Sequence, residues 1–282
     1  MKITVNNDND RDYEALFDDL IQEVFGFSFE PWLEHKLWDE RYESYSIISD
    51  NKMLSNLCIF KTDMIVQGQE VKANQFGAVC TRKSEQGKGL SRLLMEHVLN
   101  IYKDTPAFLF SNESVIDFYP RFGFKQIQTY RPIIETTIYN DPGTAKKLTA
   151  TDPIVKNIIY NRTGNSKTFE CLNTAPIQMF HMLMGYPDDI YSLPTLETII
   201  IAQQNDTVLF IADVISRMPI TFEQIKAELP FRGIAEVEFG FNPDWLEVTP
   251  TWEPVDKNEV MFFTKGDLNL PKNFRFPTTS VT

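Results

Sequence analysis

The chain has 282 residues, of which 43% are hydrophobic, and it carries a net charge of −12. This length fits one large or two modest domains with a sizeable buried core. The acidic balance argues against nucleic-acid binding, and no apolar run approaches the roughly 20 residues of a membrane helix. Residues 1–17 contain no apolar signal-peptide core, so we expect a cytoplasmic protein without nucleic-acid or membrane partners.

The first 140 residues predict a mixed α/β domain. A helix over 10–25 has Asp10 as its N-cap and Gly26 as its stop, and its apolar residues recur with helical spacing. A turn at Asp50-Asn51 separates two strands. The expected elements, in chain order, are a strand at 2–7, helices at 10–25 and 31–42, strands at 44–50, 53–66 and 71–82, a helix at 90–101, a strand at 106–112, a short helix at 114–122 and one or two strands within 124–140.

A linker is expected at 140–147, and it divides the chain into domains at 1–145 and 146–282. The second part predicts a smaller α/β domain whose order echoes that of the first. Its expected elements are a helix at 151–161, strands at 196–204 and 207–216, a helix at 221–229, a strand at 233–241, and a mostly irregular tail with one strand near 260–264. In the first domain, the helix at 90–101 is expected to bury an apolar stripe of Leu90, Leu93, Leu94, Val98 and Ile101.

Between the strand at 71–82 and the helix at 90–101 lies EQGKGLS, residues 85–91. A glycine-rich corner at a helix N-terminus exposes backbone N–H groups, which bind phosphate together with the helix dipole. Two common phosphate motifs do not fit. Arg82 stands where the nucleotide P-loop requires its first glycine, and Arg92 stands where the dinucleotide fingerprint requires its third.

The segment QGKGLS resembles the acetyl-CoA loop, [RQ]-x-x-G-x-[GA], of the GNAT superfamily of N-acetyltransferases. Gln86, Gly89 and Ser91 take its defined positions, and Ser91 departs from the usual Gly or Ala. The later segment SNESVIDFYPRFGF resembles the family's N-x6-Y-x3-G-[FY] motif, with Asn112 and Tyr119 at its key positions. The coenzyme-binding residues that this resemblance implies are Val79, Thr81, Gln86, Gly87, Lys88, Gly89, Leu90, Ser91 and Asn112.

Within the superfamily, YPRFGF resembles the subset related to the mycobacterial enhanced-intracellular-survival acetyltransferases. The resemblance implies a GNAT fold for 1–145, with a mixed central sheet flanked by helices, followed by a degenerate GNAT-like domain. A sterol-carrier-like or unrelated second domain stays open. In the three-domain relatives the C-terminal carboxylate enters the active site, and Thr282 is the candidate here.

The implied activity is direct transfer of an acetyl group from acetyl-CoA to a primary amine, with Tyr119 as the general acid. Backbone N–H groups near Val79–Thr81 would bind the pantetheine arm and the oxyanion. The general base stays open between Glu113, a water chain and the chain end. Cys80 raises a covalent alternative, although a buried cysteine is usually a small apolar residue.

The first two helices combine acidic and aromatic residues, which favours a small-molecule or peptide amine that is cationic; a solvated acidic face is the alternative. The acidic residues are Asp12, Glu14, Asp18, Asp19, Glu23, Glu34, Asp39 and Glu40, and the aromatic ones are Phe25, Phe27, Phe29, Trp32 and Trp38. Three cysteines and three histidines lack metal-ligand spacing, so no metal is expected. A non-catalytic CoA-binding sensor or scaffold and a transferase for another acyl-CoA remain alternatives, and homo-oligomerisation stays open.

Overall fold

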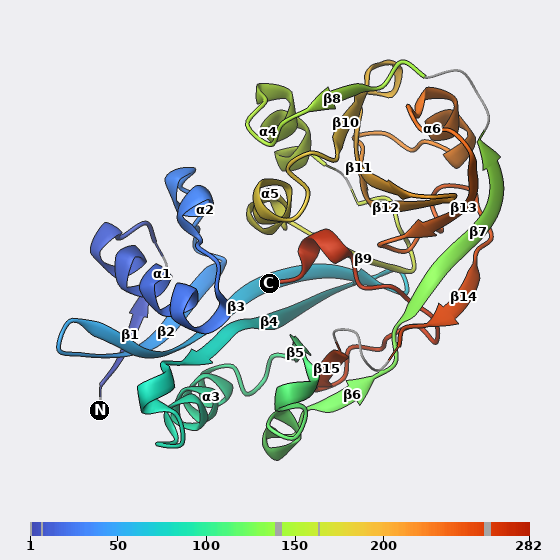
Figure 1. Cartoon of the computed structure of the whole chain (residues 1–282). Coiled ribbons are helices and arrows are strands. Elements are labelled where there is room, and N and C mark those ends of the chain that lie inside the picture. Colours follow the sequence, from blue (N-terminus) through green and yellow to red (C-terminus); the bar gives the residue numbers. More distant parts are fainter. Residues whose placement is uncertain (1, 7, 139–142, 163, 257–260) are drawn as a thin grey trace.

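The computed structural model describes residues 2–6, 8–138, 143–162, 164–256 and 261–282. Two mixed β-sheets form its frame, and helices pack against both of them (Figure 1). The expected mixed α/β architecture is therefore confirmed. No helix in the described ranges is both long and apolar enough to cross a bilayer.

The first sheet has the order β1-β2-β3-β4-β5-β15-β6, and β9 pairs with β3 beyond the end of β2. It is antiparallel except for the parallel pair β4 and β5. Its strands are β1 Ile3–Asn6, β2 Tyr42–Ser49, β3 Lys52–Val66, β4 Gln69–Thr81, β5 Ala107–Ser111, β6 Lys125–Ile127, β9 Phe169–Leu172 and β15 Met261–Lys265. The helical segments of this region are α1 Arg11–Phe25, α2 Glu30–Glu34, α3 Leu90–Ile101 and the 3-10 turns η1 Lys83–Glu85, η2 Glu113–Val115 and η3 Tyr119–Phe122.

The second sheet has the order β8-β10-β11-β12-β13-β7-β14, and its parallel pair is β12 and β13. Its strands are β7 Tyr130–Ile138, β8 Lys146–Leu148, β10 Ile190–Leu193, β11 Thr198–Asn205, β12 Val208–Ile215, β13 Ile234–Phe239 and β14 Thr251–Pro254. The helical segments around it are α4 Pro153–Tyr160, α5 Ala175–Met184, α6 Phe222–Glu228 and the 3-10 turns η4 Pro194–Leu196 and η5 Thr278–Ser280.

The two sheets follow one plan. In each, two helices come after the first strand, a hairpin leads into the fourth strand, and a helix then precedes a parallel fifth strand. The sixth place in each sheet is filled from the other half of the chain: β15 completes the first sheet and β7 completes the second. The halves have therefore exchanged strands. The division into domains at 145/146 stays a prediction. Strand β7 precedes this boundary but pairs in the second sheet, and β15 follows it but pairs in the first.

Local signals account for several elements. The Asp10 carboxylate accepts hydrogen bonds from the backbone N–H groups of Asp12 and Tyr13, and Gly26 ends α1 with φ +79°. Asp50 and Asn51 both have positive φ, as a two-residue hairpin turn requires.

Other expectations about the elements were wrong. The helix expected at 31–42 ends at Glu34, because Lys36 takes a positive φ. In α3, Leu93 and Ile101 are 41% and 48% exposed rather than buried. The segment expected as one short helix at 114–122 contains two separate 3-10 turns. The elements β8, β9, α5, β10 and β14 were not foreseen. Strand β8 begins inside the linker expected at 140–147, of which residues 140–142 lie outside the described residues.

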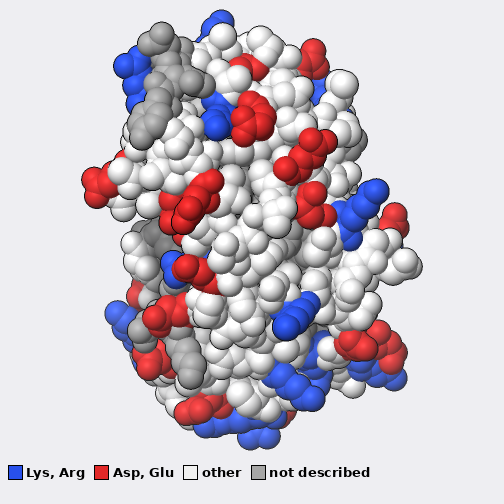
Figure 2. Space-filling view, turned by 90° about the vertical axis from the view of Figure 1, so that its right-hand side faces the viewer, with Lys and Arg blue, Asp and Glu red and all other residues white. Residues whose placement is uncertain are grey.

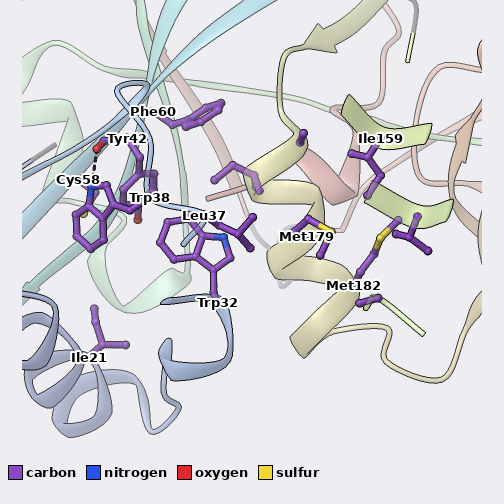
Figure 3. Close-up of a cluster of buried hydrophobic side chains, with 14 of the residues drawn as sticks. Ile21, Trp32, Leu37, Trp38, Tyr42, Cys58, Phe60, Ile159, Met179 and Met182 are labelled. Carbon is purple, nitrogen blue, oxygen red and sulfur yellow. Dashed lines mark hydrogen bonds between the residues drawn. The ribbon is translucent and has the colours of Figure 1, made fainter. Parts of the chain in front are cut away.

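A continuous apolar core joins the two halves. Figure 3 shows Trp32 and Leu37, from the α2 region, facing Met179 and Met182 of α5. The indole N–H of Trp32 also donates to the carbonyl of Pro176, at 2.8 Å. The α2 region thus packs against α5 of the second half, while α1 packs against β3 and β4 of the first sheet.

Charge is distributed unevenly over the surface. On the face seen in Figure 2, acidic side chains are scattered widely, and several Lys and Arg side chains gather at the lower end. That is the end at which α3 and β6 lie in Figure 1. Residues 51–150, which include both elements, carry 13 basic and 9 acidic side chains.

Candidate active site

Strand β4 is distorted where the site begins. Ala78 has φ +46°, and the pairing register shifts so that Gly77 faces Cys58 while Cys80 faces Asn56. A positive φ is uncommon outside glycine and is costly unless its surroundings hold it. Here the Asn56 amide donates to the Ala78 carbonyl, at 3.1 Å. The bulge is therefore a fixed feature of the strand.

Strands β4 and β5 separate just before the bulge. Their parallel pairing runs only from Asn74 to Phe76 on β4. Beyond Phe76, no described strand pairs with the β5-facing edge of β4. The predicted residues Val79 and Thr81 lie on this open stretch, where backbone groups can pair with an extended ligand.

The glycine corner has the geometry of an anion site. Gly87 and Gly89 have φ values of +78° and +81°, which favour glycine, and nothing lies within 4 Å of where their Cβ atoms would be. The helix α3 starts directly afterwards at Leu90. A pocket of about 380 Å³ lies here, lined by Thr81, Glu85, Gln86, Gly87, Gly89, Leu90, Ser91, Arg92, Glu96, Phe118, Arg121 and Phe122. The residues that open α3 therefore belong to the lining of this pocket.

Ser91, the departure from the motif, has a structural role. Its hydroxyl lies 2.6 Å from the Thr81 hydroxyl, which in turn lies 2.7 Å from the Ser55 hydroxyl. The serine thereby joins the first turn of α3 to β4 and β3. The Gln86 amide adds a longer hydrogen bond to the Thr81 carbonyl, at 3.3 Å.

The basic residues near the corner differ in their surroundings. Arg82 is bound to Asp19 and Glu23 of α1, so its charge holds that helix to β4. Lys88 is about half exposed and pairs with Glu85 at 2.9 Å. Arg121 of η3 lines the pocket and was missed in the sequence, although it lies inside YPRFGF.

Tyr119 lies in an aromatic environment. It is 6% exposed, and its ring contacts Phe118, Phe124 and Phe263, the last of which belongs to β15. Burial, and secondly the neighbouring Cys80, raises the pKa of Tyr119 to about 12. The phenol is therefore protonated at neutral pH.

Two further candidates are also located. Burial raises the pKa of the Cys80 thiol, which disfavours the thiolate that a covalent route needs. Asn112 follows β5, is exposed, and accepts a hydrogen bond from the Ser114 hydroxyl at 2.6 Å. It does not belong to the lining of the glycine-corner pocket.

A second pocket, which we call the aromatic pocket, lies on the other side of the β4 bulge. Its volume is about 210 Å³. It is lined by Ile21, Phe25, Phe27, Phe29, Trp32, Tyr42, Ala78, Ile177, Phe180, Val281 and Thr282. Both halves of the chain contribute, since Ile177 and Phe180 belong to α5.

Thr282 lies against β4 in this pocket. Its N–H donates to the Gln75 side chain at 2.7 Å, and the same side chain donates to the Ser280 carbonyl. A Cβ at Gly77 would lie 2.4 Å from the Thr282 hydroxyl and 3.3 Å from its carbonyl carbon. Glycine at position 77 therefore makes room for the segment that ends at Thr282.

The acidic residues foreseen for the acceptor side lie elsewhere. None of the eight lines the described part of the aromatic pocket. Asp18 accepts from the Phe29 N–H and the Ser28 hydroxyl, while Asp19 and Glu23 pair with Arg82. Among the residues described, no group of three or more His, Cys, Asp or Glu side chains could hold a metal ion.

Comparison with known proteins identifies the first region. Residues 7–127 match the family model of the acetyltransferase (GNAT) domain. They are therefore a GNAT domain, and GNAT acetyltransferases use acyl-CoA donors and act on amines. No curated protein sequence matches the chain.

Solved structures extend the likeness over both halves. A probable N-acyltransferase from Enterococcus faecalis superposes with a TM-score of 0.59 at 15% identity, over 93% of this chain and 72% of its own. Eis1 from Mycobacterium abscessus superposes with a TM-score of 0.56 at 14% identity, over 85% of this chain and 66% of its own. A putative acetyltransferase from Pyrococcus horikoshii superposes with a TM-score of 0.51 at 14% identity, over 99% of this chain and 96% of its own.

These likenesses concern the fold. They show a mixed α/β architecture of GNAT type, and the strand order of the second sheet repeats that of the first. The second half has no glycine between β12 and α6, where residues 216–221 read SRMPIT. Its equivalent of the glycine corner is therefore absent from the sequence.

Proposed function

We propose that the chain transfers an acetyl group from acetyl-CoA to a primary amine. The observation that carries the proposal is the position of a buried, protonated Tyr119 among residues that flank the open edge of β4 and the glycine corner. Phe118, its neighbour in the chain, lines the glycine-corner pocket. A phenol there can protonate a leaving thiolate.

The donor would lie across the corner and along β4. Its pyrophosphate would accept hydrogen bonds from the N–H groups of 86–91, with Lys88 and Arg121 adding positive charge. The pantetheine arm would pair with the backbone at Val79 and Thr81, and Asn112 would meet the arm beyond the end of β5.

The transfer needs no acyl-enzyme. The amine nitrogen attacks the thioester carbonyl carbon, and backbone N–H groups near Val79 hold the oxyanion. The C–S bond then breaks and Tyr119 protonates the sulfur, while the nitrogen loses one proton. A water chain would accept that proton.

The Tyr119→Phe variant tests this assignment. We expect release of free thiol from acetyl-CoA, measured with a panel of amines, to fall about 100-fold, in line with the usual contribution of a general acid. CoA affinity, measured by calorimetry, should stay unchanged. The matched control is Tyr160→Phe, since Tyr160 is an exposed tyrosine that lines neither pocket.

Two results would redirect the proposal. Unchanged turnover in Tyr119→Phe would remove this residue from the mechanism. Tight CoA binding by the wild type without thiol release for any amine, and for any donor in a panel of acyl-CoA esters, would favour the sensor or scaffold alternative.

A further inference from the structure

The aromatic pocket carries information about the acceptor. We infer that the acceptor is a primary amine with an aryl or short alkyl body, and that this body occupies the aromatic pocket. The inference rests on the proposed function and adds the chemical class of its second substrate. Polyamines and lysine side chains are the alternatives that the experiment separates from it.

The first argument is the chemistry of the walls. The rings of Phe27, Phe29 and Phe180 form one cluster, with centroids 5.4 Å apart for Phe27–Phe29 and 4.9 Å apart for the stacked pair Phe29–Phe180. Trp32 is 1% exposed and its indole N–H is bound to Pro176. Since this donor is already satisfied, the wall presents apolar ring surface to a ligand.

The second argument is the exposed entrance. Phe25 is 47% exposed and Phe27 is 37% exposed, and their ring centroids lie 6.2 Å apart. Exposed apolar side chains that adjoin one another at the mouth of a groove are a feature of ligand-binding sites. Here they border a pocket that continues inward to the buried side chain of Tyr42.

The third argument is size. An apolar cavity of about 150 Å³ is enough to bind benzene. The aromatic pocket, at about 210 Å³, accommodates one ring with a short linker or a short alkyl chain.

The fourth argument is charge. A polyamine has a second ammonium group, which would enter a pocket whose described lining includes no carboxylate side chain. Burial of such a charge without a partner is costly. An amine with an apolar body avoids that cost, because its single nitrogen stays at the β4 end, where it reacts.

The fifth argument is position. Ala78 lines the aromatic pocket and Thr81 lines the glycine-corner pocket. Three residue steps along the strand separate them, which is about 10 Å. The same short stretch of β4 therefore contributes to both pockets, and we place the thioester and the amine nitrogen along it.

A panel of amines tests the inference. Thiol release from acetyl-CoA is measured with 2-phenylethylamine, hexylamine, spermidine and an Nα-acetyl-lysine amide. We expect kcat/KM for the first two to exceed the others by about tenfold or more, as burial of an apolar group of this size implies. Higher kcat/KM for spermidine or the lysine amide would overturn the inference and leave the transferase proposal intact.

Substitutions in the lining of the aromatic pocket provide a second test of the inference. Phe180→Ala and Phe25→Ala should each raise KM for 2-phenylethylamine several-fold while CoA affinity stays unchanged. Phe25 is 47% exposed, so its variant should fold even if the partly buried Phe180 does not tolerate the change. The matched control is Phe231→Ala, which removes a ring that contacts Tyr191 and lines neither pocket. Equal KM values in all three variants and the wild type would refute the site.

A direct binding measurement separates the two proposals. Calorimetry with 2-phenylethylamine, in the presence of CoA, should detect binding that Phe25→Ala weakens. If no amine releases thiol but this binding occurs, the transferase proposal fails and the aryl-amine site stands. If thiol is released but 2-phenylethylamine neither binds nor reacts, the site is refuted alone.

Discussion

Asn56 positions the carbonyl of Ala78 through a chain of buried hydrogen bonds. Its amide nitrogen donates to that carbonyl at 3.1 Å, and its amide oxygen accepts from the Ser44 hydroxyl at 2.5 Å. The Tyr13 hydroxyl lies 2.7 Å from the Ser44 hydroxyl, so α1 takes part in the same network. A polar network that is fully paired rigidifies its surroundings. Here it would hold the strained residue between the two pockets.

Replacement of Asn56 by leucine should therefore affect both stability and turnover. The Ala78 carbonyl would lose a buried partner, which costs about 1–3 kcal/mol of unfolding free energy. We expect kcat to fall about tenfold because the bulge relaxes, a modest loss for a misplaced catalytic group. The affinity for CoA should stay unchanged, since residues 86–91, on which we place its pyrophosphate, lie outside this network. Thermal unfolding, steady-state kinetics and calorimetry measure the three quantities, and an unchanged kcat would contradict the role.

The raised pKa of Tyr119 predicts the alkaline side of the pH profile. A general acid must be protonated, and burial keeps this phenol protonated until the pH approaches its pKa of about 12. We therefore expect kcat to show no alkaline decline between pH 7 and pH 10. A decline with a midpoint near pH 10, the ordinary value for tyrosine, that disappears in Tyr119→Phe would contradict the burial argument.

Among the elements, the final turn η5 is anchored by one buried carboxylate. Asp213 of β12 accepts from Thr279 at 2.5 Å and from Gln178 of α5 at 2.9 Å, and it pairs with Arg162 at 3.2 Å. The His181 ring nitrogen Nε2 lies 2.7 Å from the Val281 carbonyl. These contacts direct the segment 278–282 into the aromatic pocket.

The variant Asp213→Ala should release this segment. Among the residues described, it leaves the Arg162 guanidinium with Glu170, at 3.0 Å, as its remaining ion-pair partner, and breaking a buried ion pair costs about 3–5 kcal/mol of unfolding free energy. The control is Asp188→Ala, which breaks the exposed pair with Lys147 and should cost less than about 1 kcal/mol. Denaturant unfolding compares the two variants. Equal stability would show that Asp213 does not anchor the turn.

Local and long-range elements differ in how far the sequence predicts them. The cap at Asp10, the turn at Asp50-Asn51 and the glycine corner depend on residues close together in the chain, so their patterns sufficed. The aromatic pocket depends on α5, which lies some 150 residues from α1 and was not foreseen. The acidic rim was expected from composition, but Ile21 and Phe25 occupy the pocket side of α1 while Asp19 and Glu23 bind Arg82.

For the whole molecule, the exchange of β7 and β15 is the feature that no local pattern reveals. The strand at 261–265 resembles any short apolar strand, and its place between β5 and β6 depends on contacts more than a hundred residues away. The same holds for Phe263, which brings β15 against Tyr119. The site of the first half is thus built partly from the second.

This exchange predicts the behaviour of the isolated halves. A fragment of residues 1–145 lacks β15, so β5 and β6 lose the strand that joins them, and β7 loses both partners in the second sheet. It also leaves the apolar face of α1 and α2 without α5. We expect the fragment to show no cooperative thermal unfolding by circular dichroism and no CoA binding by calorimetry.

Addition of a 146–282 fragment should restore both properties, because each half supplies the missing strand of the other sheet. The control is the intact chain under the same conditions. Cooperative unfolding and CoA binding by the 1–145 fragment alone would show that the first sheet closes without β15. That result would contradict the dependence of the first sheet on the second half of the chain.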